Sequence, residues 1–506
     1  MMRTPRRACD RLRRAVLVAV ASAALGACAF NALDNAPADP SLPWTPGDHT
    51  GSIAPAGYAV PADAAVSALQ PTAGISRDRT YGLAELIDLA QMHNPTTRIA
   101  WQAARQAALA AGMVEATYLP IITANVIGGA QEVTTPLPVP IDGKDDFTTR
   151  VEGVSPQIAL QWLVFDFGER RALHAAAKHN SSASNILFNG VHQQVIYEVA
   201  TTYHLYNAAR TRVGIARQNL ANSREIEAAA VARDREGIGT TVEVAQARQA
   251  VAQANFGLVN AEGEEGTAYQ ALLAAVGISP VTKVKVAAPP ERPLPPVVDT
   301  VTDSIVRAAL ARRPDVLASY SAMQATDSGI DAAKAAFLPK VYLAAVAAGG
   351  SSNLSAGGLP TIGQSASTSG VMMGMSVPIF TGGLRVAQLR NAESVAAASR
   401  ETFEKTKDDA AREIVVSAET LRSALASYQA ATALVSAARV TYDAASASYR
   451  AGVGNVTEAT AADSGLLVAR QAQADAHAAA LVAAANLAFM LGDMTSGSVA
   501  TGLLRR

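Results

Sequence analysis

A short β-forming stretch set inside long helical sequence occurs twice in this 506-residue chain, and no other feature limits its possible folds as much. The first copy runs from Tyr118 to Arg171 and the second from Phe337 to Arg385. In each copy, a Leu-Pro dipeptide precedes two runs of alternating apolar and polar residues, and a Gly-containing motif follows them. Alternation with a period of two predicts β-strands, so each copy predicts a β-hairpin between helices.

The second half of the chain repeats the first half at nearly constant spacing. Pro314 follows Pro95 at an offset of 219 residues, whereas Gly452 follows Gly237 at an offset of 215. The four-residue difference falls in the predicted hairpin loop, where length changes are tolerated. One unit therefore reads helix, helix, β-hairpin, long helix, glycine turn, helix, which indicates a duplicated domain and not a solenoid repeat.

These patterns divide the chain into six predicted segments. They are a signal peptide at 1–27, a Pro-rich tether at 28–76, repeat 1 at 77–280, a linker at 281–302, repeat 2 at 303–492 and a C-terminal tail at 493–506. Within the repeats we expect β-hairpins at 120–165 and 339–380, with polar loops at 134–150 and 353–368, and long helical hairpins at 168–276 and 383–491.

The N-terminal segment has the pattern of an export signal. Residues 1–14 are basic and residues 15–24 are apolar, which is typical of a signal peptide. The small residues before Cys28 resemble the cleavage box of bacterial lipoproteins, in which Cys28 would carry a diacylglycerol and an N-acyl chain. In such lipoproteins, Ala29 in the next position permits passage to the outer membrane. The alternative is an ordinary cleavage site beside an unrelated cysteine.

Charge and hydropathy exclude two classes of protein. Without residues 1–27 the chain has 36 basic and 42 acidic residues, about −6 in formal charge, which argues against a nucleic-acid partner. After the signal peptide no run of 18 apolar residues occurs, so a membrane-spanning helix is not expected.

The long helical stretches carry a seam with alternating spacings of three and four residues. In the first repeat it consists of Val199, Thr202, Tyr206, Ala209, Val213, Ala216 and Leu220. In the second repeat it consists of Ile414, Leu421, Tyr428 and Val435. Such a heptad predicts coiled-coil packing, and sixty-odd residues at 1.5 Å each predict a rod of about 100 Å. A soluble coiled-coil dimer would share this seam, but it would not account for the strands.

The predicted strands have the alternation of transmembrane β-strands. Ile158, Leu160, Trp162 and Val164 share one face of the second run, and the runs have about the 9–11 residues that cross a bilayer. Four strands cannot close a barrel, and an open sheet edge is not tolerated in lipid. Either these strands are soluble, or several chains pool them.

Together, these features resemble the TolC-type outer-membrane efflux proteins, most closely their lipidated NodT-like branch. The cleavage box, the duplicated unit, the FD and FTGG-R motifs after the hairpins and the pattern Y-x-x-G-x-x-x-x-x-E at Tyr449 to Glu458 carry the resemblance, which covers residues 77–492. It implies a mainly α chain with a transmembrane β-barrel section. Three copies would pool four strands each in a 12-stranded barrel, and the long helices would form a periplasmic α-barrel tunnel.

The resemblance also implies a function and a set of partners. The chain would be the outer-membrane channel of a tripartite efflux system, a passive conduit that exports small molecules such as drugs, toxic compounds or metal ions. Its partners would be two further copies in a homotrimer, a periplasmic adaptor (membrane fusion) protein, an inner-membrane pump and outer-membrane lipid. Two alternatives are a periplasmic, lipid-anchored coiled-coil scaffold or adaptor, and a type I protein-secretion exit duct.

The turns that follow the long helices are the candidate gate. The gate tyrosine of the family falls on Tyr449, and its acidic gate positions fall on Glu243 and Glu458; the other charged candidates nearby are Asp463, Arg235 and Arg450. The turns themselves contain Gly237, Gly239, Gly452 and Gly454, which we expect to contact the adaptor. The alternative is that these charges only solvate exposed helix ends.

No pattern of catalytic or metal-binding residues stands out. The seven histidines lack metal-ligand spacing, and the glycine pairs lack the lysine of a phosphate-binding loop. We therefore predict no enzyme, no metal site and no cofactor apart from the lipid on Cys28.

Overall fold

The computed structural model describes residues 74–141, 144–290, 294–295, 302–356 and 360–494, with scattered positions between 36 and 72. The chain divides into two compact units, Met1–Gln70 and Pro71–Arg506. In the first unit the described residues include one short 3-10 helix, η2 (Ala64–Val66). The predicted signal peptide, Cys28 and the end of the predicted tail at 495–506 lie outside the described residues.

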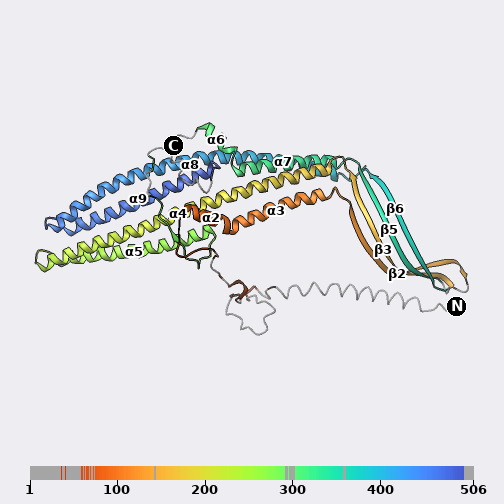
Figure 1. Cartoon of the computed structure of the whole chain (residues 1–506), viewed down its shortest axis with the longest axis horizontal. Helices are drawn as coiled ribbons and strands as arrows, with labels where there is room; N and C mark the ends of the chain where they lie inside the picture. The colour runs from red at the N-terminus through yellow and green to blue at the C-terminus, as the bar shows by residue number, and fades with distance from the viewer. Residues whose placement is uncertain are drawn as a thin grey trace. The chain divides into compact units, whose positions relative to one another are not determined.

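The second unit contains two copies of the same helical arrangement (Figure 1). The first copy has α2 (Leu83–His93), α3 (Pro95–Ala116), α4 (Glu169–Arg235) and α5 (Thr241–Val276). The second has α6 (Asp303–Leu310), α7 (Pro314–Ala335), α8 (Leu384–Arg450) and α9 (Val456–Met490). Helices α4 and α8 each have 67 residues, about 100 Å at 1.5 Å per residue.

Among the described residues, no helix combines the length and apolar character that a membrane crossing requires.

Four long strands form one antiparallel sheet in the order β2-β3-β5-β6. They are β2 (Ile121–Ile141), β3 (Lys144–Phe165), β5 (Lys340–Ala356) and β6 (Ile362–Ser376). Two short strands that the sequence did not predict, β1 (Thr80–Tyr81) and β4 (Lys285–Val286), pair in parallel. Strand β4 lies within residues 281–302, which were predicted to be a linker.

The prediction that residues 134–150 and 353–368 form loops is wrong for most of them, because the strands continue through these residues. Thr135 pairs with Phe147, and Asn353 pairs with Gly363. The three prolines of residues 136–140 are tolerated because β2 is an edge strand, where a missing N–H need not cost a ladder bond. The β2–β3 register shifts between Pro136 and Ile141.

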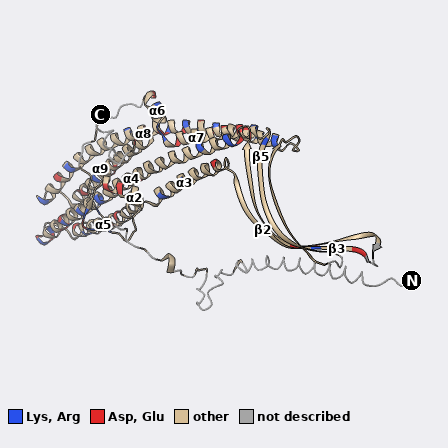
Figure 2. Cartoon of the chain, turned by 45° about the vertical axis from the view of Figure 1, so that its right-hand side comes forward, with Lys and Arg blue, Asp and Glu red and all other residues tan. Residues whose placement is uncertain are grey.

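Charged residues are frequent on the helices, and on the strands most of them gather in the part of β3 that lies away from the helices (Figure 2). Strand β6 has none, β5 has only Lys340 at its first position, and β2 has only Glu132. In β3 the charges end at Glu152, which leaves residues 153–165 uncharged. The sheet therefore has a continuous uncharged zone next to the helices.

The helical core follows the predicted heptad. Val199, Val213 and Leu220 are buried along α4, and Ile414 and Leu421 are buried along α8. The predicted linker contributes as well, since Val284 and Val286 join the core around α2, α4 and α5. Tyr203 donates to Ala287 O at 2.9 Å and so holds this segment against α4.

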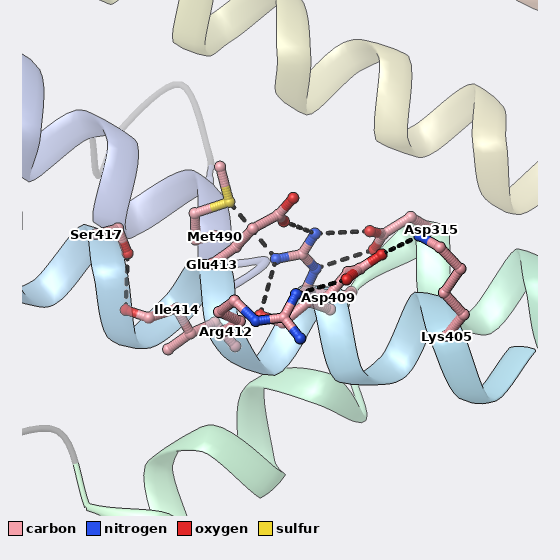
Figure 3. A network of polar contacts seen from close by, with 10 residues as sticks. Asp315, Lys405, Asp409, Arg412, Glu413, Ile414, Ser417 and Met490 are labelled. Carbon is pink, nitrogen blue, oxygen red and sulfur yellow. Dashed lines mark hydrogen bonds and ion pairs between the residues drawn. The ribbon is translucent and has the colours of Figure 1, made fainter.

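In each repeat, the residue before a proline connects the short helices to the long helical hairpin. This residue is Asn94 in repeat 1 and Arg313 in repeat 2. In repeat 1, Asn94 caps α3 by accepting from Thr96 N and donates to Ala275 O in α5, both at 2.9 Å. In repeat 2, the equivalent Arg313 is buried at the start of α7. Its guanidinium group binds Asp315 and Glu413 in an ion-pair network next to Met490 (Figure 3).

A buried ion pair fixes the junction between β3 and α4. Arg170 Nε donates to Asp166 Oδ2 at 2.9 Å, and both side chains are 8% exposed. The other guanidinium nitrogens donate to Thr117 O at 2.9 Å and Val164 O at 3.2 Å. One side chain thus ties together the end of α3, the end of β3 and the start of α4.

Candidate functional site

The two glycine turns at the far ends of the long helices have the same backbone geometry. Gly237 and Gly452 follow α4 and α8 with φ of +73° and +81°, a left-handed conformation that glycine adopts without strain. The amides of the next two residues in each turn donate to Arg233 O and Ser448 O, respectively, at 2.9–3.1 Å. Both turns are therefore tight caps that end one helix and start the next.

The second glycine of each turn is closely packed. A Cβ on Gly239 would lie 2.7 Å from Asp234 N, which is closer than real Cβ atoms approach, so this position has no room for a side chain. A Cβ on Gly454 would lie 3.0 Å from Tyr449 N, so a side chain there would require its neighbours to shift by a few tenths of an ångström.

Between the two glycines, each turn presents one exposed apolar residue. Ile238 is 66% exposed and Val453, its equivalent at the offset of 215, is 83% exposed. Neither residue was singled out from the sequence, although its place between two glycines of a tight turn was a usable signal. Each turn therefore carries one exposed apolar side chain at its apex.

Tyr449 lies at the centre of an apolar cluster that joins both helical hairpins, and only 1% of it is exposed. We call this group the tip cluster; its buried members are Ile226, Ala230, Val244, Ala247, Tyr449, Val456 and Ala459. The Tyr449 hydroxyl is buried without a hydrogen-bond partner among the described residues. Burial raises the pKa of Tyr449, with a further contribution from Glu243. The structure thus shows an apolar contact that joins the two helical hairpins of the chain.

A cation that the sequence did not suggest, Arg233, lies over the ring of Tyr449. Its guanidinium carbon lies 5.3 Å from the centre of the Tyr449 ring, within cation–π range. The predicted cation Arg235 is exposed at the last position of α4. The local sequence does not indicate which of the two arginines faces Tyr449, because this depends on how α4 is rotated against α8.

Glu243 and Glu458 both occupy the third position of a helix. The Glu243 amide donates to Thr240 Oγ1 at 3.2 Å, and the Thr240 amide donates back to the Glu243 carboxylate at 3.4 Å. Glu458 N donates to Asn455 Oδ1 at 2.8 Å, and its side chain is exposed. A capping box therefore accounts for the Glu243 carboxylate, whereas Glu458 takes part in its cap only through the backbone amide.

Arg450 pairs with an acid that the sequence did not single out. Its Nη2 donates to Glu225 Oε2 at 3.0 Å, which links the end of α8 to α4. Both side chains are well exposed, so this ion pair contributes little energy by itself.

Asp463 is buried in the wall between the repeats and does not lie on the exposed turns. It is 3% exposed on α9 and accepts hydrogen bonds from Asn222 at 2.9 Å, Asn219 at 2.9 Å and Ser223 at 3.0 Å, all on α4. Burial raises its pKa, and the three hydrogen bonds oppose that effect. Farther from the turns, Arg212 Nε donates to Asp475 Oδ1 at 2.7 Å between the same two helices.

The described residues contain no group of three or more His, Cys, Asp or Glu side chains that could hold a metal ion. A polar cavity of about 550 Å³ adjoins Asp463, with glutamines 246, 249 and 253 of α5 and Gln471 of α9 in its lining. The polar chemistry near the turns thus consists of hydrogen-bond donors, acceptors and ion pairs between helices.

A family model described as outer membrane efflux protein matches residues 86–278 and 305–493, which together include both helical hairpins and both β-hairpins. Among curated proteins, the chain is 28% identical to protein CyaE of Bordetella pertussis over 80% of this chain and 83% of that protein. It is 24% identical to the cation efflux system protein CusC of Escherichia coli K12 over 64% of this chain and 70% of that protein.

Solved structures share the fold. The Campylobacter jejuni CmeC outer membrane channel superposes with a TM-score of 0.69 at 18% identity, over 83% of this chain and 87% of that chain.

Proposed function

The chain belongs to the outer membrane efflux protein family, and on that premise we propose that three copies form the exit duct of a tripartite efflux assembly. It is an efflux channel protein of the outer membrane, with its long helices in the periplasm. In the assembly, an adaptor in the periplasm and a pump in the inner membrane supply the cargo and the energy. The observation that carries this proposal is the four-stranded sheet with two open edges, β2 and β6, joined to helices of about 100 Å.

The sheet supplies the membrane-spanning part in this proposal. Its uncharged zone suits a hydrocarbon environment, where charged side chains are costly. The two free edges must be paired in lipid, because unpaired backbone groups cost several kcal/mol there. Pairing β6 of one copy with β2 of the next, three times over, closes a barrel of 12 strands.

The glycine turns form the periplasmic entrance and the gate. Tyr449 and the tip cluster hold the two helical hairpins of one chain together at this entrance. Glu243 and Glu458 place a carboxylate at the start of each returning helix, and Arg235 and Arg450 place a cation at the end of each rising helix. These charges ring the entrance, where they act on passing cargo and on neighbouring subunits.

Fractionation tests the channel proposal. The chain is expected in the outer-membrane fraction and as a trimer on denaturing gels unless the sample is heated. Cys28→Ser is the matched variant for the proposed lipid: it should lose labelled palmitate while the trimer persists. Release of the wild-type chain from membranes by high salt would instead identify a peripheral scaffold and contradict the channel.

The exposed apolar residues of the turns are the proposed docking points for the adaptor. Replacing both Ile238 and Val453 by Asp should weaken adaptor capture by more than about tenfold, because each apex would lose apolar contact area and gain a desolvation cost. Binding of the cognate adaptor to immobilised trimers measures this change. The matched control is Val259→Asp, a 58%-exposed apolar position of α5 away from the turns. An equal loss in the control would show that docking does not depend on the turns.

A further inference from the structure

A cavity of about 810 Å³ lies between α4, α8 and α9, where the two repeats meet (Figure 1). Residues 288–290, which follow β4, border it as well. The cavity surrounds His204, which lies roughly 45 Å along α4 from the last residue of that helix, Arg235, at 1.5 Å per residue. It is therefore separate from the candidate gate, and its volume suits a small organic molecule.

The His204 side chain lines this cavity without a hydrogen-bond partner. It is 6% exposed, and neither of its ring nitrogens is bonded to a described residue. Asn207, one helical turn farther along α4, is also 6% exposed; it donates to Tyr203 O, but its Oδ1 has no partner among the described residues. Because buried polar groups are nearly always hydrogen-bonded, these atoms call for a partner that the fold itself does not supply.

The lining of the cavity carries positive charge. Arg210, Arg470, His204 and His477 border it, and none of its described lining residues is an aspartate or a glutamate. Arg470 is partly buried; it attracts the Asp463 carboxylate but forms no ion pair with an acid of the described residues. A recessed group of cations without a facing acid attracts anions, and a guanidinium group binds a carboxylate by charge-assisted hydrogen bonds.

The duplication shows that helix packing does not require these side chains. At the offset of 215 between Gly237 and Gly452, His204 corresponds to Glu419 and His477 corresponds to Glu262. Each of these glutamates pairs with an arginine, so charge is balanced there. The cationic lining is therefore particular to one place in the chain and is not a by-product of the repeated fold.

We propose that this cavity binds an amphipathic organic anion, a molecule with a carboxylate, an apolar body and a hydroxyl group. Arg470 holds the carboxylate. The apolar body lies against Ile215, Val435 and Leu481, which line the cavity from α4, α8 and α9. The hydroxyl donates to the unpaired Oδ1 of Asn207. The bound molecule thus joins three helices of both repeats.

Binding is linked to the protonation of His204. Burial and then the charge of His477 lower the pKa of His204 to about 4. A bound carboxylate favours the charged imidazole, so it raises this pKa toward the ordinary value of about 6.5 and takes up a proton. Binding at pH 5.5 is therefore expected to be about three- to tenfold tighter than at pH 7.5.

The other charged or titratable groups around His204 come from all three helices. They are Tyr203 and Arg210 on α4, Tyr428 on α8, and Arg470 and His477 on α9. Of these, His477 is the one that gains charge at low pH, so it acts in the same direction as His204.

Equilibrium dialysis of the purified full-length protein against 6-hydroxy-2-naphthoate tests this proposal, with protein-free micelles of the same uncharged detergent as the blank. The wild type should bind with a Kd below about 1 mM at pH 6, and the neutral 6-hydroxy-2-naphthamide at least about tenfold more weakly. Arg470→Gln should also weaken naphthoate binding at least about tenfold. Arg470→Lys keeps the charge and should bind at least about threefold more tightly than Arg470→Gln.

Two further variants complete the test. Arg224→Gln removes an exposed arginine of α4 that does not border the cavity, so it should bind like the wild type. His204→Gln should flatten the dependence of the Kd on pH, which a merely structural role would leave unchanged. Circular dichroism and the Tm of each variant establish that it is folded.

Each failure has its own meaning. If the wild type binds no more naphthoate than the micelles do, water satisfies the buried polar atoms and the proposal is overturned. Equal binding by the wild type and Arg470→Gln would place the naphthoate elsewhere, and an unchanged pH profile in His204→Gln would remove His204 from the site. All lining residues come from one chain, so a failure of the channel proposal in fractionation would leave these results as they are.

Discussion

Replacing Tyr449 by alanine is expected to lower the stability of the helical tips by about 3–5 kcal/mol, the range for removing a large buried aromatic side chain. Tyr449 is 1% exposed and contacts helices from both repeats, so the cavity would open in the contact that joins them. Hydrogen exchange of the amides near the ends of α4 and α8 measures this local stability. Conductance in planar bilayers should rise in the same variant, because the apolar contact that holds the two hairpins together at the entrance is weakened.

Tyr449→Phe is the informative companion variant. The hydroxyl has no partner among the described residues, so its removal should change stability by less than about 1 kcal/mol. Val453→Ala, on the exposed turn, should be equally mild. If Tyr449→Phe were as damaging as Tyr449→Ala, the contact between the two hairpins would depend on the Tyr449 hydroxyl instead of apolar packing.

Arg170→Leu is expected to destabilise the junction of strand and helix by about 3–5 kcal/mol, because it leaves Asp166 as an unpaired buried charge. It also removes the donors to Thr117 O and Val164 O. Arg170→Lys should recover only part of the loss, since an ammonium group cannot reproduce the planar fork that reaches three acceptors. Urea unfolding followed by tryptophan fluorescence reports the change, and Trp162 lies at this junction, where it donates to Tyr118 O.

The second repeat supplies the control for Arg170. Arg385 is its equivalent, but Thr381 replaces the aspartate there, so Arg385→Leu leaves no buried carboxylate behind. Its expected cost is below about 1 kcal/mol. Equal losses in both variants would mean that the ion pair is not the source of the stability, and that the arginine stem or a contact with another subunit matters instead.

Local signals were sufficient for the helices and their ends. Asn94-Pro95 and the glycines at 237 and 452 act through backbone conformation and capping within a few residues. The duplication made these predictions stronger, because each signal appears twice in the same order. The strand ends were mistaken for loops because proline and glycine usually interrupt strands, whereas here the position of β2 at the sheet edge removes the penalty.

The sequence by itself therefore determined the two repeats, their long helices, their glycine turns and the family to which the chain is similar. Only the tertiary structure decided which charged groups meet. Asp463 and its partners are some 240 residues apart, and Arg233, not Arg235, faces Tyr449. The physical reason is that each residue along a helix turns the side chain by about 100°, so the direction of a side chain depends on how two long helices are rotated against each other. That rotation is set by packing along their whole length and by no short stretch of sequence.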